Sequence, residues 1–377
     1  METPFVFGRI ASEKNFTDRR NETERLVLNF CSSVNTIMIS PRRWGKSSLV
    51  MKAADQALKK NKKIRFCFID LNNVRSDEQF YQLFATKVLG ASASKIRILV
   101  ENSRKFLGKF LPNITISPGP GTEFKLGLDW KEVKRDPDDI LDLPEKIGNE
   151  NDMKFVICID EFQNISVFDQ PLEMQKKMRA HWQKHKNVSY CLYGSKRHMM
   201  MDVFTSPSMP FYKFGDIIFL EKILSEDWIL FIQKRFSDTG KKISRENAAL
   251  IPGLTDCHPY YVQQLAQQSW LRTETVCNDT IVNKAFTDLV MQLSMLFQNL
   301  TDTLGRKQIS FLRALINDIT QLSSQSTLSE YQLGTSANAV KIKKILANKE
   351  IIDSHGNNIS FLDPLYKHWL KEYFFEV

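Results

Sequence analysis

The sequence predicts an α/β protein in which a parallel sheet precedes a helical subdomain and a C-terminal unit of helices and a β-hairpin. Three observations predict this order. In the N-terminal half, short apolar runs alternate with amphipathic stretches, which is typical of buried parallel strands joined by helices. From about 225 to 301 the apolar periodicity is helical. From about 304, two helices around a tight turn precede two short alternating runs. We expect domains over 1–222, 223–302 and 303–377.

The first strand is expected over 34–39 and the first helix over 46–60, followed by a second apolar strand over 64–71. Ser76 or Asp77 is the expected N-cap of the next helix. Two alternating runs around a Pro/Gly cluster then predict an inserted β-hairpin within 112–130. The sheet should continue through a helix, a strand, a helix and a further strand, which we place at 137–150, within 154–165, over 170–185 and over 188–195.

Composition narrows the class of protein. The chain has 377 residues with 42% hydrophobic and 25% charged residues, which is ordinary for a globular protein of two or three domains. No apolar run is long enough to span a bilayer, and we expect no secretory signal and no membrane partner. Six cysteines without metal-ligand spacing are typical of reduced thiols, so we expect a cytoplasmic protein. The net charge is +9. This charge is equally compatible with an anionic partner and with a basic surface that binds none.

A candidate phosphate-binding loop, "ISPRRWGKSSL", follows the first strand at 39–49. In the pattern G-x-x-x-x-G-K-[ST], Gly45 allows close backbone approach, Lys46 supplies charge and Ser47 offers a hydroxyl to Mg²⁺. Ser40 stands where the pattern has its first glycine. We therefore expect nucleotide contacts from the run Pro41, Arg42, Arg43, Trp44, Gly45, Lys46, Ser47 and Ser48.

A second motif, which is acidic, supports this interpretation of the loop. "FVICIDE" at 155–161 is an apolar strand that ends in two carboxylates. Asp160 is a candidate Mg²⁺ ligand together with Ser47, and Glu161 is a candidate to polarise the water that attacks the γ-phosphate. Taken alone, two carboxylates after a strand are typical of an ordinary solvent-exposed turn. Together with the lysine loop on a neighbouring strand of one sheet, the pair indicates a nucleotide site at the carboxyl ends of the strands.

Five segments in order resemble the archaeal-type ATPase family of AAA+-related P-loop ATPases, which is close to the STAND signalling ATPases and also occurs in bacteria. They are "NFTDRRNE" (15–22), "ISPRRWGKSSL" (39–49), "ICIDEFQNI" (157–165), "LYGSKRHMM" (192–200) and "CHPYYVQQL" (257–265). The resemblance extends over nearly the whole chain. It implies a P-loop ATPase domain, a helical lid and a C-terminal winged helix, with ATP and Mg²⁺ as cofactors.

The resemblance also implies roles for further residues. Asp18 and Arg19 match the segment that borders the nucleotide, although a helix-capping Asp beside a surface Arg is an equal alternative. Ser195 matches the polar sensor of the γ-phosphate, and its alternative is a turn residue at a strand end. His258 and Pro259 match a motif of the lid, although a proline at a helix start needs no ligand to explain it. Lys46, Glu161 and Ser195 form the expected catalytic set.

Three positions depart from the family pattern. Ser40 and Cys257 stand where the family has glycines, and Phe214 stands where it has an arginine. If hydrolysis needs that cation, then Lys213, Arg197 or a partner has to supply it. We therefore expect slow turnover.

The C-terminal helices and hairpin match a winged helix, with a turn at 333–335 and two strands around a Gly–Asn turn within 351–363. The presumed recognition helix has four candidate phosphate-binding lysines: Lys341, Lys343, Lys344 and Lys349. Small side chains near its start could approach base edges: Thr335, Ser336, Ala337 and Asn338. Residues 304–377 contain nine Lys or Arg and seven Asp or Glu, so the charge is only +2. Double-stranded DNA and a protein partner remain equal alternatives.

These observations predict a Mg-ATP-binding ATPase that acts as a nucleotide-driven switch coupled to a winged helix, with a homo-oligomer as one assembly that would complete its sites. The alternatives are a nucleotide-binding regulator with little hydrolysis and a DNA-binding regulator with a degenerate ATPase core. A metal–thiol enzyme or a serine hydrolase has no support, since neither ligand spacing nor a nucleophile elbow is present.

Overall fold

The computed structural model describes residues 3–10, 15–93, 101, 105–106, 115–118, 124–127, 138–355 and 358–376. The chain forms two compact units. We call Arg19–Glu221 the sheet unit, and Met1–Asp18 with Lys222–Val377 the helical unit. The N-terminal segment, which we had assigned to the first domain, therefore groups with the helical unit.

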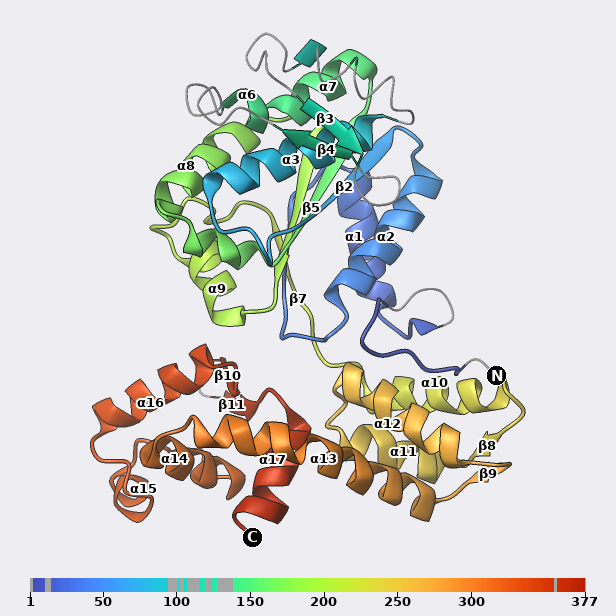
Figure 1. Cartoon of the computed structure of the whole chain (residues 1–377), viewed down its shortest axis with the longest axis vertical. Helices are drawn as coiled ribbons and strands as arrows, with labels where there is room; N and C mark the ends of the chain where they lie inside the picture. Colours follow the sequence, from blue (N-terminus) through green and yellow to red (C-terminus); the bar gives the residue numbers. More distant parts are fainter. Residues whose placement is uncertain are drawn as a thin grey trace. The chain divides into compact units, whose positions relative to one another are not determined.

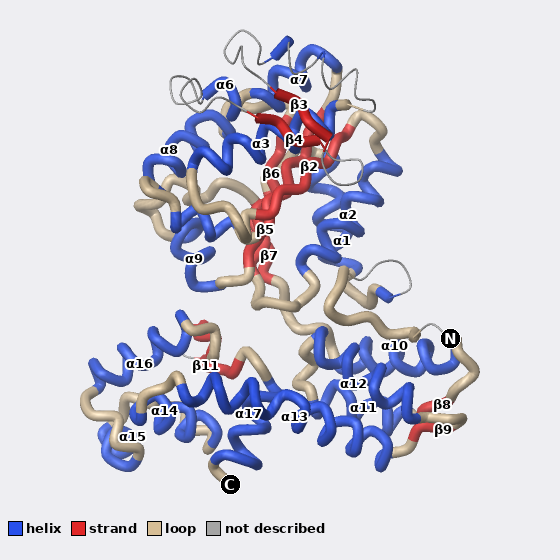
Figure 2. Tube along the Cα trace, in the orientation of Figure 1, coloured by secondary structure: helices blue, strands red, loops and turns tan. Residues whose placement is uncertain are grey.

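The sheet unit contains the predicted parallel sheet, whose strands are drawn in red in Figure 2. The strand order is β2-β5-β6-β1-β7, and all neighbours are parallel. Both β1 and β6 are buried along their whole length, because helices cover both faces of the sheet. The five strands are β1 (Thr36–Ile39), β2 (Ile64–Asp70), β5 (Lys154–Asp160), β6 (Val188–Gly194) and β7 (Asp216–Phe219). This confirms the predicted α/β class.

Helices α1 and α2 lie on one side of the sheet, and α8 and α9 lie on the other (Figure 1). Ser76 is the N-cap of α3 and accepts a hydrogen bond from the backbone N–H of Gln79, as one of the two predicted caps. The helix predicted over 137–150 is divided in two, since Pro144 starts a new helix. The helices are α1 (Arg20–Cys31), α2 (Lys46–Lys60), α3 (Asp77–Ser92), α6 (Asp138–Leu141), α7 (Leu143–Asn151), the 3₁₀ helix Phe162–Val167, α8 (Pro171–Trp182) and α9 (Arg197–Thr205).

The predicted hairpin insertion is present. Strands β3 (Thr115–Pro118) and β4 (Phe124–Gly127) pair antiparallel, with Thr115 opposite Gly127. Residues 119–123, which include part of the Pro/Gly cluster, lie outside the described residues.

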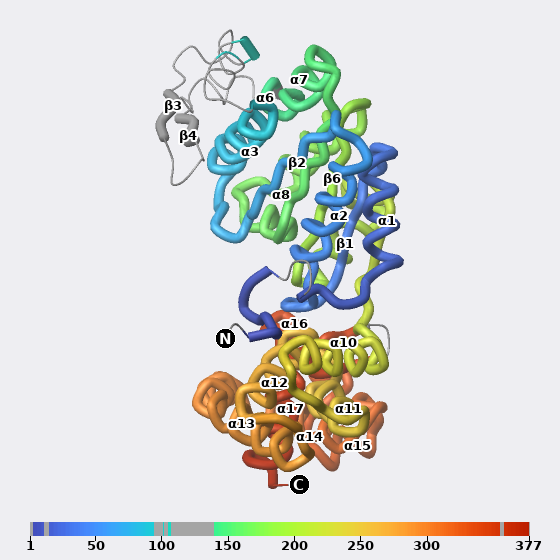
Figure 3. Tube along the Cα trace, turned by 90° about the vertical axis from the view of Figure 1, so that its right-hand side faces the viewer, coloured from blue at the N-terminus to red at the C-terminus, as the bar shows by residue number. Residues whose placement is uncertain are grey.

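The C-terminal portion of the helical unit, Lys222–Val377, starts with the predicted lid helices, which Figure 3 colours in chain order. Two two-residue strands that pair in parallel, β8 and β9, interrupt the stretch that we predicted as wholly helical. Strands this short have no alternation that a sequence pattern could reveal. The elements are α10 (Ser225–Ser237), β8 (Lys242–Ile243), α11 (Arg245–Leu254), α12 (Pro259–Arg272), β9 (Val276–Cys277) and α13 (Asp279–Asp302).

The C-terminal part has the predicted helix-turn-helix and hairpin. Gly334 adopts a φ of 87° in the turn before α16, a conformation that favours glycine. Strands β10 and β11 pair antiparallel, and the turn residues 356–357 lie outside the described chain. The elements are α14 (Arg306–Ile316), α15 (Gln325–Glu330), α16 (Ser336–Asn348), β10 (Ile352–His355), β11 (Asn358–Phe361), α17 (Pro364–Trp369) and a π-helical turn, Leu370–Phe374.

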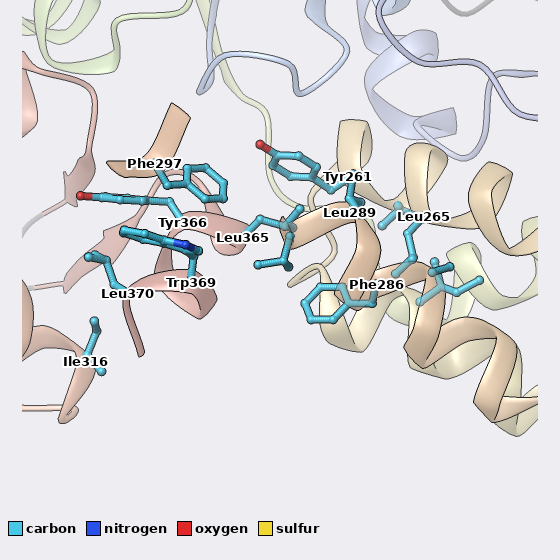
Figure 4. Packing of buried hydrophobic residues seen from close by; sticks show 14 of the residues in the cluster. Tyr261, Leu265, Phe286, Leu289, Phe297, Ile316, Leu365, Tyr366, Trp369 and Leu370 are labelled. Carbon is cyan, nitrogen blue, oxygen red and sulfur yellow. The ribbon is translucent and has the colours of Figure 1, made fainter. Parts of the chain in front are cut away.

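One hydrophobic cluster runs through the helical unit, from the lid helices to the winged helix. Figure 4 shows part of this cluster, with Phe297 of α13 beside Tyr366 and Trp369. Phe286 of α13 also packs against α17, because its ring centroid lies 4.8 Å from that of His368. The Phe297 ring centroid lies 5.4 Å from that of Tyr366 and 6.0 Å from that of Trp369. The lid and the winged helix therefore share one core.

The N-terminal segment is anchored to α12 in the same unit. The Phe5 ring is buried against Phe236, with a centroid distance of 5.8 Å. The Gln263 side chain accepts a hydrogen bond from the backbone N–H of Val6 at 3.2 Å, and Gln267 donates one to the carbonyl of Phe5 at 3.2 Å.

Among the helices of the described chain, none combines the length and apolar character that crossing a membrane would require.

Candidate nucleotide site

Three neighbouring strands deliver the predicted site residues to one edge of the sheet. β6 lies between β1 and β5, and all three run in the same direction. Lys46 follows β1, Asp160 ends β5 and Ser195 follows β6. Since carboxyl ends of parallel strands meet at one edge, these residues converge where ligands bind in open α/β sheets.

The loop between β1 and α2 has the backbone that a phosphate loop requires. Gly45, immediately before α2, has a φ of 87°, in the region that favours glycine. Helix α2 starts at Lys46, so its first backbone N–H groups and its dipole can act on an anion at the loop. Ser40 is not among the described residues with a positive φ, so the serine at this position requires no left-handed backbone.

The Lys46 side chain is buried and held across the loop. Its Nζ donates hydrogen bonds to the carbonyl oxygens of Ser40 at 3.2 Å and Pro41 at 2.9 Å. The Ser40 hydroxyl also donates to the Pro41 carbonyl, at 3.1 Å. The lysine ammonium is thus placed at the centre of the loop by main-chain oxygens.

Ser47 and Asp160 are in direct contact, as a shared metal site requires. The Ser47 hydroxyl donates a 2.8 Å hydrogen bond to Oδ2 of Asp160. Burial raises the pKa of Asp160 above its ordinary value, and the hydrogen bond from Ser47 opposes part of that shift. A hydroxyl and a carboxylate side by side fit Mg²⁺, which takes oxygen ligands and often uses only one or two from protein.

Hydrogen bonds from two residues hold the side chain of Glu161 in place. Its backbone lies in the left-handed region, with a φ of 51°. Its Oε2 accepts hydrogen bonds from the Ser195 hydroxyl at 2.9 Å, from the Ser195 backbone N–H at 3.3 Å and from the amide of Gln163. The predicted sensor Ser195 therefore contacts the predicted water-polarising carboxylate directly.

Gln163 is a site residue that sequence reasoning missed. It is 1% exposed, and its Oε1 atom occupies space that a β-carbon on Gly194 would need, at 1.9 Å. In the sequence, Gln163 is one of three polar residues, with Asn164 and Ser166, that alternate or adjoin apolar residues after Glu161. That pattern could not distinguish a buried amide from a surface one.

The segment before α1 places Arg19 in the sheet unit and Asp18 in the helical unit. Arg19 is 4% exposed, so it is not the surface arginine of the alternative interpretation. Its Nη1 donates a 3.1 Å hydrogen bond to Glu22, and its carbonyl accepts one from the Thr23 hydroxyl at 2.6 Å. Both Asp18 and Arg19 have positive φ values, 52° and 62°.

His258 and Pro259 lie in the helical unit, at the N-terminus of α12. Pro259 is the first residue of that helix, which is the position that suits proline independently of any ligand. His258 is buried, and its ring centroid is 5.0 Å from that of Tyr261. Cys257, which replaces the family glycine, has a φ of 53°, so this position does require the conformation that glycine adopts most easily.

Phe214, at the position of the family arginine, belongs to the hydrophobic core of the sheet unit. The Arg179 guanidinium lies 4.9 Å from the Phe214 ring centroid, and burial lowers the pKa of Arg179. The two predicted substitutes pack on other rings, Lys213 on Tyr212 and Arg197 on Phe219. Arg179 is a cation near this position that the sequence did not suggest.

In the presumed recognition helix, Lys341 and Lys344 are exposed. Lys349 is engaged by the chain, since its Nζ donates to the carbonyl of Thr303 at 3.1 Å. The Thr335 hydroxyl caps the helix by accepting from the backbone N–H of Asn338 at 3.2 Å. The Asn338 amide donates to the carbonyl of Leu333 at 2.5 Å. Only Ser336 and Ala337 of the four small residues lack such capping roles among the described contacts.

Comparisons with known proteins agree with this architecture. Residues 295–372 match a family described as a probable winged helix domain. The Walker-type ATPase PABY2304 of Pyrococcus abyssi superposes with a TM-score of 0.67 at 16% identity, covering 98% of this chain and 99% of that chain. No curated protein matches the sequence.

Two proteins of Aeropyrum pernix, ORC2 and ORC1, have the same fold. ORC2, in its ADPNP–ADP complexes, gives a TM-score of 0.54 at 14% identity over 96% of this chain and 94% of that chain. ORC1, in complex with DNA, gives 0.51 at 12% identity over 100% and 99%. These three structures and the matched family model show that this chain has the P-loop ATPase fold with a C-terminal winged helix.

Proposed function

We propose that this protein is a Mg-ATP-dependent switch that hydrolyses ATP to ADP and phosphate at the carboxyl edge of its sheet and couples the nucleotide state to its winged helix. The observation that supports this most is the pair of contacts from Ser47 to Asp160 and from Ser195 to Glu161. They bring together, at the ends of three strands, the kinds of side chain that hydrolysis of a phosphoanhydride needs.

Each side chain has a role in this proposal. Lys46 and the N–H groups at the start of α2 bind the phosphate oxygens. Ser47 and Asp160 would hold Mg²⁺, which would supply positive charge to offset the negative charge that develops on the departing ADP. Glu161 orients a water molecule and accepts its proton, and Ser195 links the strand end of β6 to that carboxylate.

The contacts of Glu161 also favour a second candidate, a regulator that binds nucleotide and hydrolyses it slowly. Its Oε2 accepts three hydrogen bonds from Ser195 and Gln163, so part of its capacity to bind water is used. Phe214 in the core offers no cation to the transition state. A partner, or a second copy of the chain, would then be needed for full turnover.

The winged helix is the proposed output of the switch. ORC1, which has this fold, is known in complex with DNA. Lys341 and Lys344 are the exposed lysines of α16 that could contact phosphates of double-stranded DNA. The low net charge of the C-terminal part keeps a protein partner as the alternative.

The proposal is tested by measuring phosphate release from Mg-ATP by the purified protein, with and without double-stranded DNA. We expect turnover that Lys46→Ala abolishes together with nucleotide binding, while Lys59→Ala, at the exposed end of α2, leaves both unchanged. Normal ATP binding by Lys46→Ala would contradict the loop assignment. ATP binding without turnover in the wild type would identify the slow regulator instead.

A further inference from the structure

The helical unit contains a groove with a volume of about 1010 Å³, formed by the winged helix and the end of α11. Its walls come from the loop over 318–323, from α16, from β11 and from α17. Side chains of the hydrophobic core line it, among them Phe311, Leu315 and Leu322. A groove of this size exceeds most small-molecule pockets and has room for several residues of a peptide.

One wall of the groove is a strand with an unpaired edge. In the described chain β11 pairs with β10 alone, in a sheet of two strands. All four residues of β11, Asn358–Phe361, line the groove, and the loop over 318–323 lines it as well. A strand edge with free backbone N–H and C=O groups is a template for an added strand.

The charges around the groove do not balance. Both acidic residues that line it already have a basic partner: Asp318 lies 3.9 Å from Lys367, and Asp256 lies 2.5 Å from Lys222. The lining residues Lys343 and Lys371 have no ion pair within the part of the chain that the structure describes. The groove therefore combines an apolar floor with two uncompensated ammonium groups.

We propose that this groove binds an extended segment of a partner protein in which apolar residues alternate with acidic ones. The segment would add to the edge of β11, place its apolar side chains on the floor and direct carboxylates to Lys343 and Lys371. Double-stranded DNA is a poorer occupant, because its surface offers no apolar side chains to the floor. The exposed lysines Lys341 and Lys344 do not line the groove, so α16 presents a different face to it. This inference does not depend on nucleotide hydrolysis.

The test uses the full chain and an array of short labelled peptides that alternate valine, leucine or phenylalanine with glutamate, serine or lysine. Binding is measured by fluorescence anisotropy without nucleotide. We expect saturable binding of glutamate peptides, at least about tenfold tighter than of lysine peptides. Methylation of alternate backbone nitrogens should abolish it in the register that removes the ladder hydrogen bonds. If no glutamate peptide binds, or if lysine peptides bind equally, the proposal is wrong.

Variants distinguish the groove from the outer face of α16. Lys343→Glu with Lys371→Glu should weaken binding of the glutamate peptide by at least about tenfold. The matched pair Lys341→Glu with Lys344→Glu should change it by less than about twofold. Circular dichroism verifies that each pair folds. Equal loss in both pairs, or displacement of the peptide by duplex DNA through Lys343 and Lys371, would assign the surface to nucleic acid instead.

Discussion

The hydroxyl of Ser195 donates a 2.9 Å hydrogen bond to Oε2 of Glu161, so the end of β6 is coupled to the carboxylate that follows β5. The Ser195 backbone N–H donates to the same oxygen at 3.3 Å. A shift of the segment after β6 would therefore move both donors at once. This relationship offers a physical route by which, in the proposed function, a change at the γ-phosphate would reach the carboxylate proposed to activate water.

Replacement of Glu161 by glutamine should separate binding from chemistry. The amide keeps the size of the side chain but cannot accept a proton from water, so ATP binding should persist while turnover falls by about 100-fold or more. Isothermal titration and phosphate release measure the two properties. Unchanged turnover would remove Glu161 from the mechanism.

Gly194→Ala should disturb the candidate site indirectly, by displacing the Gln163 side chain that contacts Glu161. Its β-carbon would lie 1.9 Å from Oε1 of Gln163 and 2.8 Å from Sδ of Met200, so the Gln163 amide must leave Glu161. We expect a loss of stability of about 1–3 kcal/mol and a fall in turnover, measured by thermal unfolding and phosphate release. Gly90→Ala is the matched control, because a β-carbon there meets nothing within 4 Å.

A second variant tests the cause of that effect. Removing the amide in Gly194→Ala with Gln163→Ala should restore part of the lost stability without restoring turnover. If Gly194→Ala alone behaves as Gly90→Ala does, the Gln163 contact has no functional role.

Stability should fall as pH drops below 6.5 because of His185. Burial lowers the pKa of His185 from its ordinary value of 6.5, although Asp142 opposes this shift. The contacts fit a neutral ring that donates through Nε2 to Asp142 at 3.0 Å and accepts the Tyr190 hydroxyl at Nδ1 at 2.9 Å. The unfolded chain therefore binds the proton more readily, and the stability present above pH 6.5 is lost as pH falls toward the folded pKa.

The test compares unfolding free energies of wild type and His185→Gln from neutral to mildly acidic pH. The variant should be less stable by about 1–3 kcal/mol at neutral pH and should depend less on pH. His198→Gln, on α9, is the control and should retain the wild-type slope. A variant slope identical to that of wild type would exclude His185 as the source. His368, whose pKa burial also lowers, contributes equally to all three proteins.

If the winged helix binds DNA, removal of Lys341 and Lys344 should weaken that binding. Both lysines are exposed on α16 and could each neutralise one phosphate. The double alanine variant should therefore reduce the slope of log affinity against log salt by about two. Lys59→Ala, in the sheet unit, is the control. An unchanged slope, or no DNA binding by wild type, would favour a protein partner.

The class of the fold and the local parts of the site follow from the amino-acid sequence alone. Strand and helix periods are local properties, so the parallel sheet, the lid and the winged helix could be predicted from apolar spacing. The lysine loop and the acidic strand end are also local, because each depends on a few consecutive residues. For the same reason the N-cap of α3 could be narrowed to Ser76 or Asp77, of which the structure has Ser76.

Which distant groups meet became visible only in the folded chain. The contact of Glu161 with Ser195 and Gln163 depends on strand order, and no spacing along the chain specifies that β6 lies beside β5. The burial of Phe214, the packing of Phe5 against Phe236 within the helical unit and the unpaired edge of β11 in the described chain likewise result from packing between remote segments. Which segments pack together depends on competition among all the apolar surfaces of the chain. A pattern along the sequence does not encode that competition.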